Sequence, residues 1–252
     1  MFFIENMLEE KNKLHFTLLD PEKQAPSEAA EIAGLCENMG SDAIMLGGST
    51  ADNKQVLDDT ARLIRGAVTI PLILFPHKAD AVTQYTEYIF YMSLLNSENR
   101  DYLVGEQVKA ARLIKRYDIK PIGMGYIVIS TGRKKTTVEK VADLIKLTSK
   151  DVEQIIDYAL CAQFFGLKCV YLEAGSGAKK PVDPDLISKV KKSIDIPLIV
   201  GGGIRDGLTA KTIAEAGADV IVTGTAAEEN PQVIKEIIGG LHMSHLIPST
   251  GP

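Results

Sequence analysis

The stretch IPLIVGGGIRDGLTAKTIAEAGADVIVTGT, from Ile196 to Thr225, twice joins a short apolar run to a glycine-bearing turn. Short apolar runs bounded by Pro or Gly are typical of strands that are buried on both faces of a parallel sheet. The apolar spacing between the two runs, which ends at Gly217, predicts one helix. The stretch therefore predicts two successive βα units.

The turns at the ends of these two runs predict a phosphate site. Gly201, Gly202 and Gly203 follow the first run, and Gly224 with Thr225 follows the second. Glycine lets backbone N–H groups approach a ligand without a Cβ in the way. Glycines also end strands for purely structural reasons, but the loops after strands 7 and 8 of a (β/α)8 barrel commonly hold a phosphate.

Apolar runs of this kind recur along the whole chain and alternate with helical patterns. The predicted strands are 14–19, 42–46, 72–75, 88–95, 121–129, 169–172, 197–200 and 219–222. This alternation is typical of βα units, and 252 residues are close to the roughly 250 of one eight-stranded barrel. We expect a single TIM (β/α)8 barrel domain over residues 1–252. A doubly wound sheet stays open, because spacing does not reveal whether a sheet closes.

Three segments show local features. The chain after strand 72–75 is too short for a full helix, so irregular chain is expected there. Residues 138–147 and 152–165 have apolar spacings that predict helices. From about residue 241 the sequence becomes polar, and we expect a mobile tail.

Composition limits the partners and the compartment. A net charge of −5 provides no broad basic surface, so nucleic acid is not an expected partner. The three cysteines are widely spaced, which is typical of buried thiols in a reducing compartment. No signal peptide and no apolar run of about 20 residues is found. We expect a cytoplasmic protein that does not span a membrane, with at most transient contact with a membrane surface.

Two residues at predicted strand ends have the chemistry of a magnesium site. Asp20 follows the first strand and Ser49 follows the second. Mg²⁺ prefers hard oxygen ligands and is often completed by substrate phosphates. The alternative is that Asp20 caps the turn at Pro21 and Ser49 caps a helix.

Glu173 has the position of a general base. It lies between an apolar strand and a glycine-rich loop, where partial burial raises the pKa of a carboxyl group. A buried Glu is rarely tolerated without a reason. The alternative is a salt bridge to a neighbouring strand end.

Two further groups of residues could bind one substrate that has a charged part and an apolar part. Arg133 and Lys134, with Lys135, form a basic loop that would neutralise a second phosphate group, or is simply solvated. An aromatic band surrounds the fourth strand and would line a groove for an apolar tail, or pack in the core. Its members are Tyr85, Tyr88, Phe90, Tyr91, Met92 and Tyr102.

Several of these motifs, in this order, resemble the archaeal geranylgeranylglyceryl phosphate synthases and the related bacterial heptaprenylglyceryl phosphate synthases. The motifs are HFTLLDPE (15–22), IMLGGST (44–50), YLEAGSGA (171–178), VGGGIR (200–205) and TGT (223–225). They extend over nearly the whole chain. The chain length and the Ala174-Gly175 form of the glycine loop are more similar to the larger archaeal subgroup.

The resemblance implies a TIM barrel whose third helix is replaced by irregular chain, and a prenyltransferase of archaeal membrane lipid biosynthesis. Such an enzyme joins sn-glycerol 1-phosphate to geranylgeranyl diphosphate through an ether bond and releases diphosphate with the help of Mg²⁺. It implies Asp20 and Ser49 as Mg²⁺ ligands, Glu173 as the base, and a homo-oligomer, either a dimer or a hexamer. The implied glycerol 1-phosphate site comprises Tyr171, Leu172, Glu173, Ala174, Gly175, Ser176, Gly177, Gly202, Gly203, Gly224 and Thr225.

Two other function classes stay open at this point. A phosphate-sugar isomerase or aldolase-like barrel would use the same loops. It would need a second well-placed acid or base, or a Schiff-base lysine at a strand end, and Lys168 precedes its strand. A non-catalytic phosphate-binding barrel would show no turnover at all.

Overall fold

The computed structural model describes residues 3–47, 53–76, 78–132, 142–175 and 177–243. Eight parallel strands form a closed barrel in chain order, and β8 pairs with β1. This confirms the TIM barrel and excludes the doubly wound sheet. The strands are β1 (Leu14–Leu19), β2 (Ala43–Leu46), β3 (Leu72–Leu74), β4 (Tyr88–Leu94), β5 (Lys120–Val128), β6 (Cys169–Glu173), β7 (Leu198–Gly201) and β8 (Val220–Thr223).

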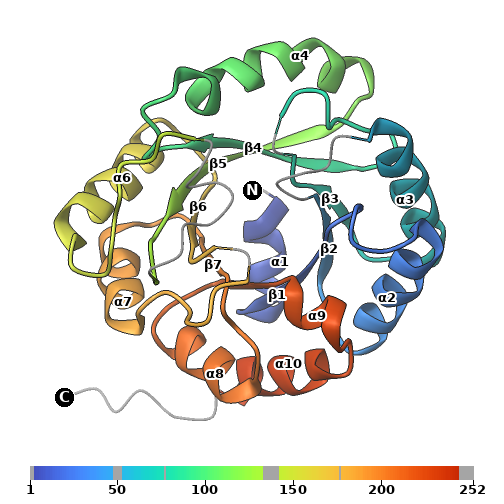
Figure 1. Ribbon diagram of the computed structural model, residues 1–252. Helices are drawn as coiled ribbons and strands as arrows, with labels where there is room; N and C mark the ends of the chain where they lie inside the picture. The colour runs from blue at the N-terminus through green and yellow to red at the C-terminus, as the bar shows by residue number, and fades with distance from the viewer. Residues whose placement is uncertain (1–2, 48–52, 77, 133–141, 176, 244–252) are drawn as a thin grey trace.

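Most of the helices form a ring around the strands (Figure 1). The helices in chain order are α1 (Phe3–Lys11), which lies inside that ring, α2 (Pro26–Asn38), α3 (Lys54–Ala67), the π-helical turn η1 (Asp101–Gly105), α4 (Glu106–Arg116), α6 (Val152–Phe164), α7 (Pro184–Ser193), α8 (Gly207–Glu215), α9 (Thr225–Glu229) and α10 (Val233–Met243). In the described part of the chain, no helix has both the length and the apolar character needed to cross a membrane.

Strand residues alternate between two separate cores. Phe16 and Ile199 belong to the core inside the barrel, whereas Leu172 and Ile221 pack in the layer between strands and helices. Both faces of each strand are therefore buried, which explains why the strands are apolar runs rather than alternating ones.

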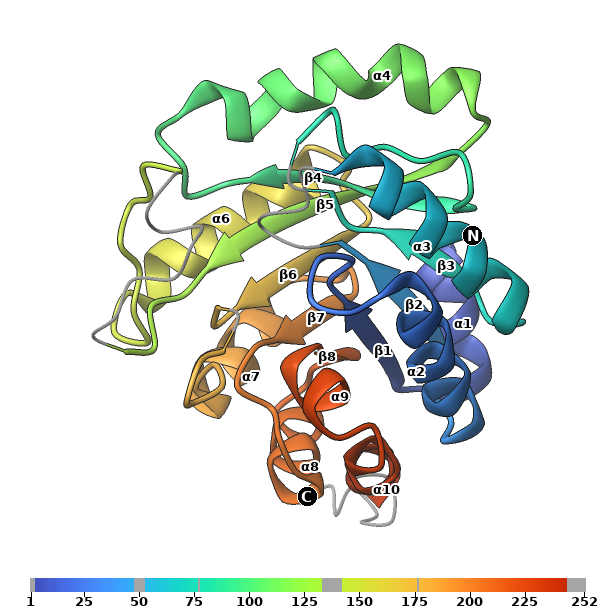
Figure 2. The ribbon, with the colours of Figure 1, turned by 45° about the vertical axis from the view of Figure 1, so that its right-hand side comes forward.

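Helix α1 closes the end of the barrel at which the strands begin. Ile4 is buried in the inner core, and the ring of Phe3 stacks on Tyr88 with centroids 3.9 Å apart. Figure 1 shows α1 at the centre of the ring, and Figure 2 shows it on the side from which β4, β5 and β6 start. The opposite end, where the strands finish, is left for a site.

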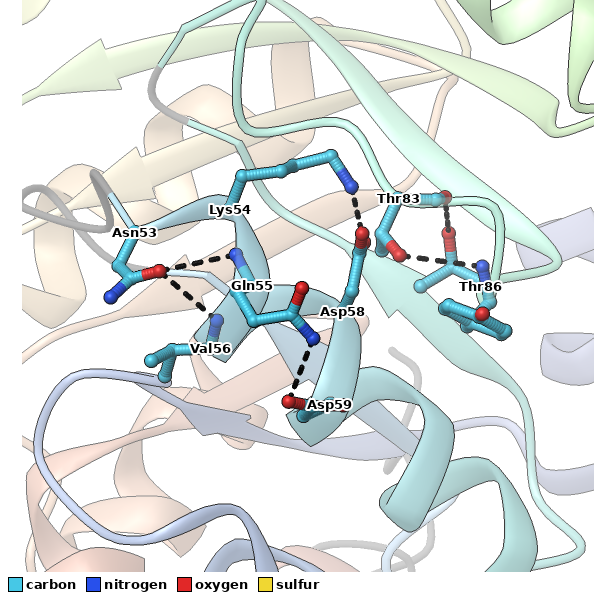
Figure 3. Close-up of polar contacts among 9 residues, drawn as sticks. Asn53, Lys54, Gln55, Val56, Asp58, Asp59, Thr83 and Thr86 are labelled. Atoms are coloured by element: carbon cyan, nitrogen blue, oxygen red, sulfur yellow. Dashed lines mark hydrogen bonds and ion pairs between the residues drawn. The ribbon is translucent and has the colours of Figure 1, made fainter.

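No helix connects β3 to β4 in the described residues 75–76 and 78–87, as expected. Thr83 is fully buried there, and its hydroxyl accepts a hydrogen bond from the backbone N–H of Tyr85 at 3.4 Å. The Thr86 hydroxyl donates to the Thr83 carbonyl at 3.3 Å. Figure 3 shows this turn beside the start of α3, where the side chain of Asn53 caps the helix. Threonine side chains thus supply the turn with polar partners that a helix would otherwise provide.

Two expectations about elements are wrong in part. Residues 142–147 are not helical, because their backbone pairs with other segments: Leu144 bridges Ser97, and Leu147 bridges Ile129. Helix α10 extends to Met243 with Leu241 fully buried, so the polar tail does not begin at 241. Residues 244–252 lie outside the described residues.

Candidate active site

One cavity of ≈ 200 Å³ lies at the end of the barrel where the strands finish. It runs from the turns after β6, β7 and β8 to helix α4, which lies across the barrel from β8 (Figure 1). Its glycine-rich end is lined by Gly175, Gly177, Gly202, Gly203, Gly224 and Thr225, and its apolar end includes Val82, Ile89, Tyr91, Met92, Ala110 and Ile114. Tyr171 and Glu173 line the same cavity. A closed parallel barrel gathers these residues because all strands finish at one rim.

Glu173, the last residue of β6, has a buried carboxylate, with only 8% of the residue exposed. The backbone N–H of Gly175 donates to its Oε1 at 2.5 Å, and the hydroxyls of Tyr126 and Tyr171 also donate to it. Burial raises the pKa of Glu173, although these three hydrogen bonds act in the opposite direction. No Lys or Arg among the described residues forms an ion pair with Glu173, so the salt-bridge alternative fails there.

Aromatic rings surround this carboxylate. Tyr126 and Tyr171 lie edge to face with centroids 5.1 Å apart, and Phe75 lies 5.7 Å from Tyr126 and 5.9 Å from Tyr171. Sequence reasoning missed Tyr126 and Phe75 as site residues. The alternation of side chains along β5 could have identified Tyr126, because Met124, Tyr126 and Val128 all face the inner core.

The turn after β7 needs glycine for two separate reasons. Gly202 and Gly203 have φ of +84° and +73°, which other residues rarely adopt. A Cβ at Gly202 would lie 2.6 Å from Glu173 Oε1, and one at Gly203 would lie 2.5 Å from the Lys180 carbonyl group. The glycine turn therefore packs directly against the candidate base.

The turn after β8 leads into a short helix. Gly224 precedes α9, which begins at Thr225. The first N–H groups of a helix have no partner within the helix and attract anions. Both glycine turns border the same end of the cavity, as the sequence predicted for a phosphate site.

Two residues of the predicted substrate site do not face the cavity. The side chains of Leu172 and Ala174 are buried in the outer core between strands and helices. They alternate with Tyr171 and Glu173 along the strand, so only their backbone is near the site. Ser176 lies outside the described residues.

Asp20 directly follows β1 at the same rim but does not line the cavity. The residue is 9% exposed, and one carboxylate oxygen accepts the N–H of Glu22 at 3.1 Å, which is the cap of the turn at Pro21 that the alternative expects. No Lys or Arg in the described part of the chain pairs with it. A buried carboxylate without a cation is a hard oxygen donor of the kind that Mg²⁺ prefers, so Asp20 fits a magnesium ligand.

The other residues predicted to bind Mg²⁺ or diphosphate are not among the residues that the structure describes. Ser49, Arg133 and Lys134 fall outside the described residues. Within those residues, no group of three or more His, Cys, Asp or Glu forms a metal site. Any further ligands would therefore come from other residue types, from positions outside the described residues or from substrate.

The predicted aromatic band divides between the two ends of the barrel. Phe90, Tyr91, Met92 and Tyr102 line the cavity, whereas Tyr85 and Tyr88 do not. Tyr88 lies at the start of β4, where it stacks on Phe3. For these two residues the alternative of core packing holds: Tyr85 precedes β4 and packs against the outer core, and Tyr88 packs against the inner core where β4 begins.

Comparisons with known proteins agree with this architecture. The PcrB family matches residues 5–241. Geranylgeranylglyceryl phosphate synthase from Pyrococcus abyssi is 44% identical over 231 residues, 92% of this chain and 90% of that protein. The enzyme from Thermococcus gammatolerans is 47% identical over 225 residues, 89% and 88% of the two chains.

A solved structure gives the same result. The (S)-3-O-geranylgeranylglyceryl phosphate synthase from Thermoplasma acidophilum, in complex with its substrate sn-glycerol-1-phosphate, superposes with a TM-score of 0.90 and 39% identity. The superposition covers 96% of this chain and 98% of that one. Over nearly its full length, therefore, the chain belongs to the PcrB family.

Proposed function

We propose that the protein is a prenyltransferase that joins sn-glycerol 1-phosphate to geranylgeranyl diphosphate through an ether bond and releases diphosphate, in archaeal membrane lipid biosynthesis. The names of its relatives and the glycerol phosphate bound to the Thermoplasma acidophilum enzyme support this reaction. The observation that carries the proposal is one cavity with a glycine-rich end and an apolar end, with the buried carboxylate of Glu173 on its wall.

Glycerol 1-phosphate occupies the glycine-rich end. Its phosphate accepts hydrogen bonds from backbone N–H groups of the turns at Gly202 and Gly224, together with the start of α9. Backbone donors on a closed barrel are already in place before the substrate arrives. The reacting hydroxyl is thereby held beside Glu173 instead of diffusing freely.

Glu173 accepts the proton of that hydroxyl as the ether bond forms. Its raised pKa makes the carboxylate a stronger base than a solvated Glu. The hydroxyls of Tyr126 and Tyr171 and the N–H of Gly175 hold the carboxylate in one orientation. They also stabilise its ionised form, which is the form that takes the proton.

The prenyl diphosphate occupies the rest of the cavity. Its tail lies along the apolar end between β4 and α4. Its diphosphate extends out of the cavity toward the rim, where Asp20 follows β1. Asp20 and Ser49 would hold Mg²⁺, which would neutralise charge on the leaving diphosphate. Arg133 and Lys134 contribute further positive charge to that group.

An isomerase or aldolase of sugar phosphates is the weaker alternative. A small polar sugar phosphate would not fill the apolar end of the cavity. Lys168 precedes β6 and so lies at the opposite end of that strand from the site. It is therefore badly placed to form a Schiff base.

The deciding assay combines the protein with radiolabelled glycerol 1-phosphate, Mg²⁺ and prenyl diphosphates of graded length. We expect a lipid-soluble product, with geranylgeranyl diphosphate as the preferred donor. If no chain length gives product, the protein is not a prenyltransferase of this kind. Light scattering on the same sample tests for the homo-oligomer, a dimer or a hexamer, that we also propose.

The role of Asp20 is tested separately. We expect Asp20→Asn to require a much higher Mg²⁺ concentration for half-maximal activity, because the amide oxygen carries no negative charge. The measurement is a Mg²⁺ titration of initial rate for the two proteins. An unchanged titration curve would exclude Asp20 as a ligand.

A further inference from the structure

Phe75 is an aromatic residue of the site to which the proposed mechanism assigns no role. It follows β3 at the rim where the strands finish, and it lines the cavity while remaining half-buried. The hydroxyls of Tyr126 and Tyr171 are hydrogen-bonded to Glu173, so these two residues already have a polar role. Phe75 has no polar atom in its side chain, so its half-buried ring has no hydrogen-bonding role in the cavity.

The ring is held firmly in place. Its backbone N–H donates to the Leu46 carbonyl at 2.8 Å, and Gly47 packs so closely that a Cβ there would lie 1.9 Å from the Phe75 carbonyl oxygen. Phe90, which is fully buried, meets the Phe75 ring edge to face with centroids 6.1 Å apart. These contacts fix the backbone at Phe75, and Phe90, Tyr126 and Tyr171 contact its ring.

Phe75 also lies between the two ends of the cavity. On one side it stacks on Tyr171, whose hydroxyl binds the candidate base. On the other side, Phe90 and Ile89 of β4 continue toward the apolar end. The carbon that receives the glycerol oxygen must lie between its tail and the attacking hydroxyl, which places it near this ring.

The reaction develops positive charge that the face of an aromatic ring can stabilise. The bond between the allylic carbon and the diphosphate oxygen breaks, and its electron pair leaves with diphosphate. The glycerol oxygen forms the new bond to that carbon, and its proton goes to Glu173. Positive charge develops on the allylic carbon in between, and the face of an aromatic ring attracts a cation.

We propose that the face of the Phe75 ring stabilises the positive charge on the allylic carbon during prenyl transfer. The inference rests on the proposed function, and it adds a catalytic residue to it. The ring is electrically neutral, so it favours the charged transition state over the neutral tail of the bound substrate. Its effect should therefore appear in the rate of bond formation more than in substrate binding.

The test is a series of fluorinated phenylalanines at position 75, introduced by codon suppression. Fluorine withdraws electron density from the ring face with little change in size, so packing is preserved. We expect the single-turnover rate of ether formation to fall stepwise from Phe to 4-fluoro-, 3,5-difluoro- and 3,4,5-trifluoro-phenylalanine. The full decrease should be about 30-fold, the factor that corresponds to about 2 kcal/mol for a desolvated cation–π contact.

The same series at Phe3 is the matched control, because that ring stacks on Tyr88 at the far end of the barrel. It should leave the rate unchanged. Phe75→Leu should lower the rate by a similar factor to trifluorination while glycerol phosphate binding, measured by calorimetry, is retained.

Three outcomes separate the two proposals. A stepwise decrease at position 75 alone supports the role of Phe75. A flat series on an active enzyme, or a change in KM with no change in single-turnover rate, rejects that role and leaves the prenyltransferase intact. Absence of product from the unmodified protein rejects the proposed function and this inference together.

Discussion

A carboxylate that works as a base must be buried enough to be basic and solvated enough to ionise. Glu173 meets both conditions through neutral donors: two tyrosine hydroxyls and the N–H of Gly175. A cationic partner would also stabilise the charge, but it would lower the pKa and weaken the base. Burial thus raises the pKa of Glu173, and its neutral donors oppose that rise without cancelling it.

The first prediction concerns the charge of this residue. Glu173→Gln keeps the shape of the side chain but cannot accept a proton, so we expect kcat to fall at least ~100-fold, the scale of general-base loss. Calorimetry should show that glycerol 1-phosphate still binds. Turnover close to that of the unmodified protein would mean that Glu173 is not the base.

The pH dependence follows from the same group. Burial raises the pKa of Glu173, and a base acts only when deprotonated. We therefore expect kcat/KM to fall as pH decreases through this raised pKa, at a pH above the ordinary range of Glu. The same pH profile can be measured on the residual activity of Glu173→Gln. If kcat/KM of that variant still falls over the same pH range, another group causes the decrease.

The glycine beside the base gives a third prediction. Gly202→Ala places a methyl group against Glu173 Oε1 at a φ of +84°, so we expect impaired glycerol phosphate binding and turnover. Gly166→Ala is the control, because its φ is +75° and no atom lies within 4 Å of its added Cβ. Gly166→Ala should lose stability from backbone strain alone, on the order of 1 kcal/mol, and keep its activity. Equal catalytic effects at both positions would show that backbone strain, not contact with Glu173, is responsible.

At the scale of elements, helix α1 separates the site from solvent at the other end of the barrel. Ile4 is 2% exposed and packs among inner-core residues such as Leu14. The inner core would otherwise be open where the strands begin. The helix is thus part of the barrel's packing rather than an appendage.

This contact can be tested by truncation. Ile4→Ala should lower the free energy of unfolding by about 2 to 4 kcal/mol, because it removes buried methyl groups and leaves a cavity. Leu208→Ala is the control: Leu208 is 76% exposed, and its loss should change stability by less than about 0.5 kcal/mol. Denaturant unfolding of the two variants measures the difference. Similar values for both would mean that α1 does not close the barrel in solution.

The predictions for individual elements succeeded where local chemistry decides the structure. The segment after β3 is short, and the absence of a full helix there was predicted from its length. Residues 142–147 have a helical spacing, but their backbone pairs with Asn96 and Ser130, which lie far away in the sequence. Long-range pairing of this kind overrides local propensity.

At the scale of the molecule, a buried polar network joins the first and last strands. His15 of β1 is fully buried, with Nε2 2.8 Å from the Thr223 hydroxyl of β8 and Nδ1 2.9 Å from the Ser41 hydroxyl. Burial lowers the pKa of His15 to about 3 from an ordinary 6.5. The network therefore holds the seam at which the barrel closes, and it does so with a neutral imidazole.

This seam predicts acid sensitivity. The folded protein holds His15 neutral, while the unfolded chain takes up a proton below pH 6.5, so stability is fully present above pH 6.5 and is lost as pH falls toward 3. Between pH 7 and pH 5 we expect a loss of about 2 kcal/mol from this residue. His15→Gln should be less stable at pH 7 but should lose less stability over that range. Parallel losses in both proteins, measured by urea unfolding, would exclude His15 as the source.

The sequence by itself determined the eight strands and the strand ends at which the glycines and carboxylates gather, whereas the order of the strands around a closed barrel came from the structure. It could do so because apolar runs, Gly and Pro determine the structure of short stretches of chain. Parallel strands in a closed barrel also all finish at one end. Only the tertiary structure decided that Tyr126 and Phe75 surround Glu173, that Leu172 and Ala174 face away, and that Tyr88 belongs to the far end. Burial, hydrogen-bond partners and pKa depend on which residues meet in space, and no local pattern in the chain contains that information.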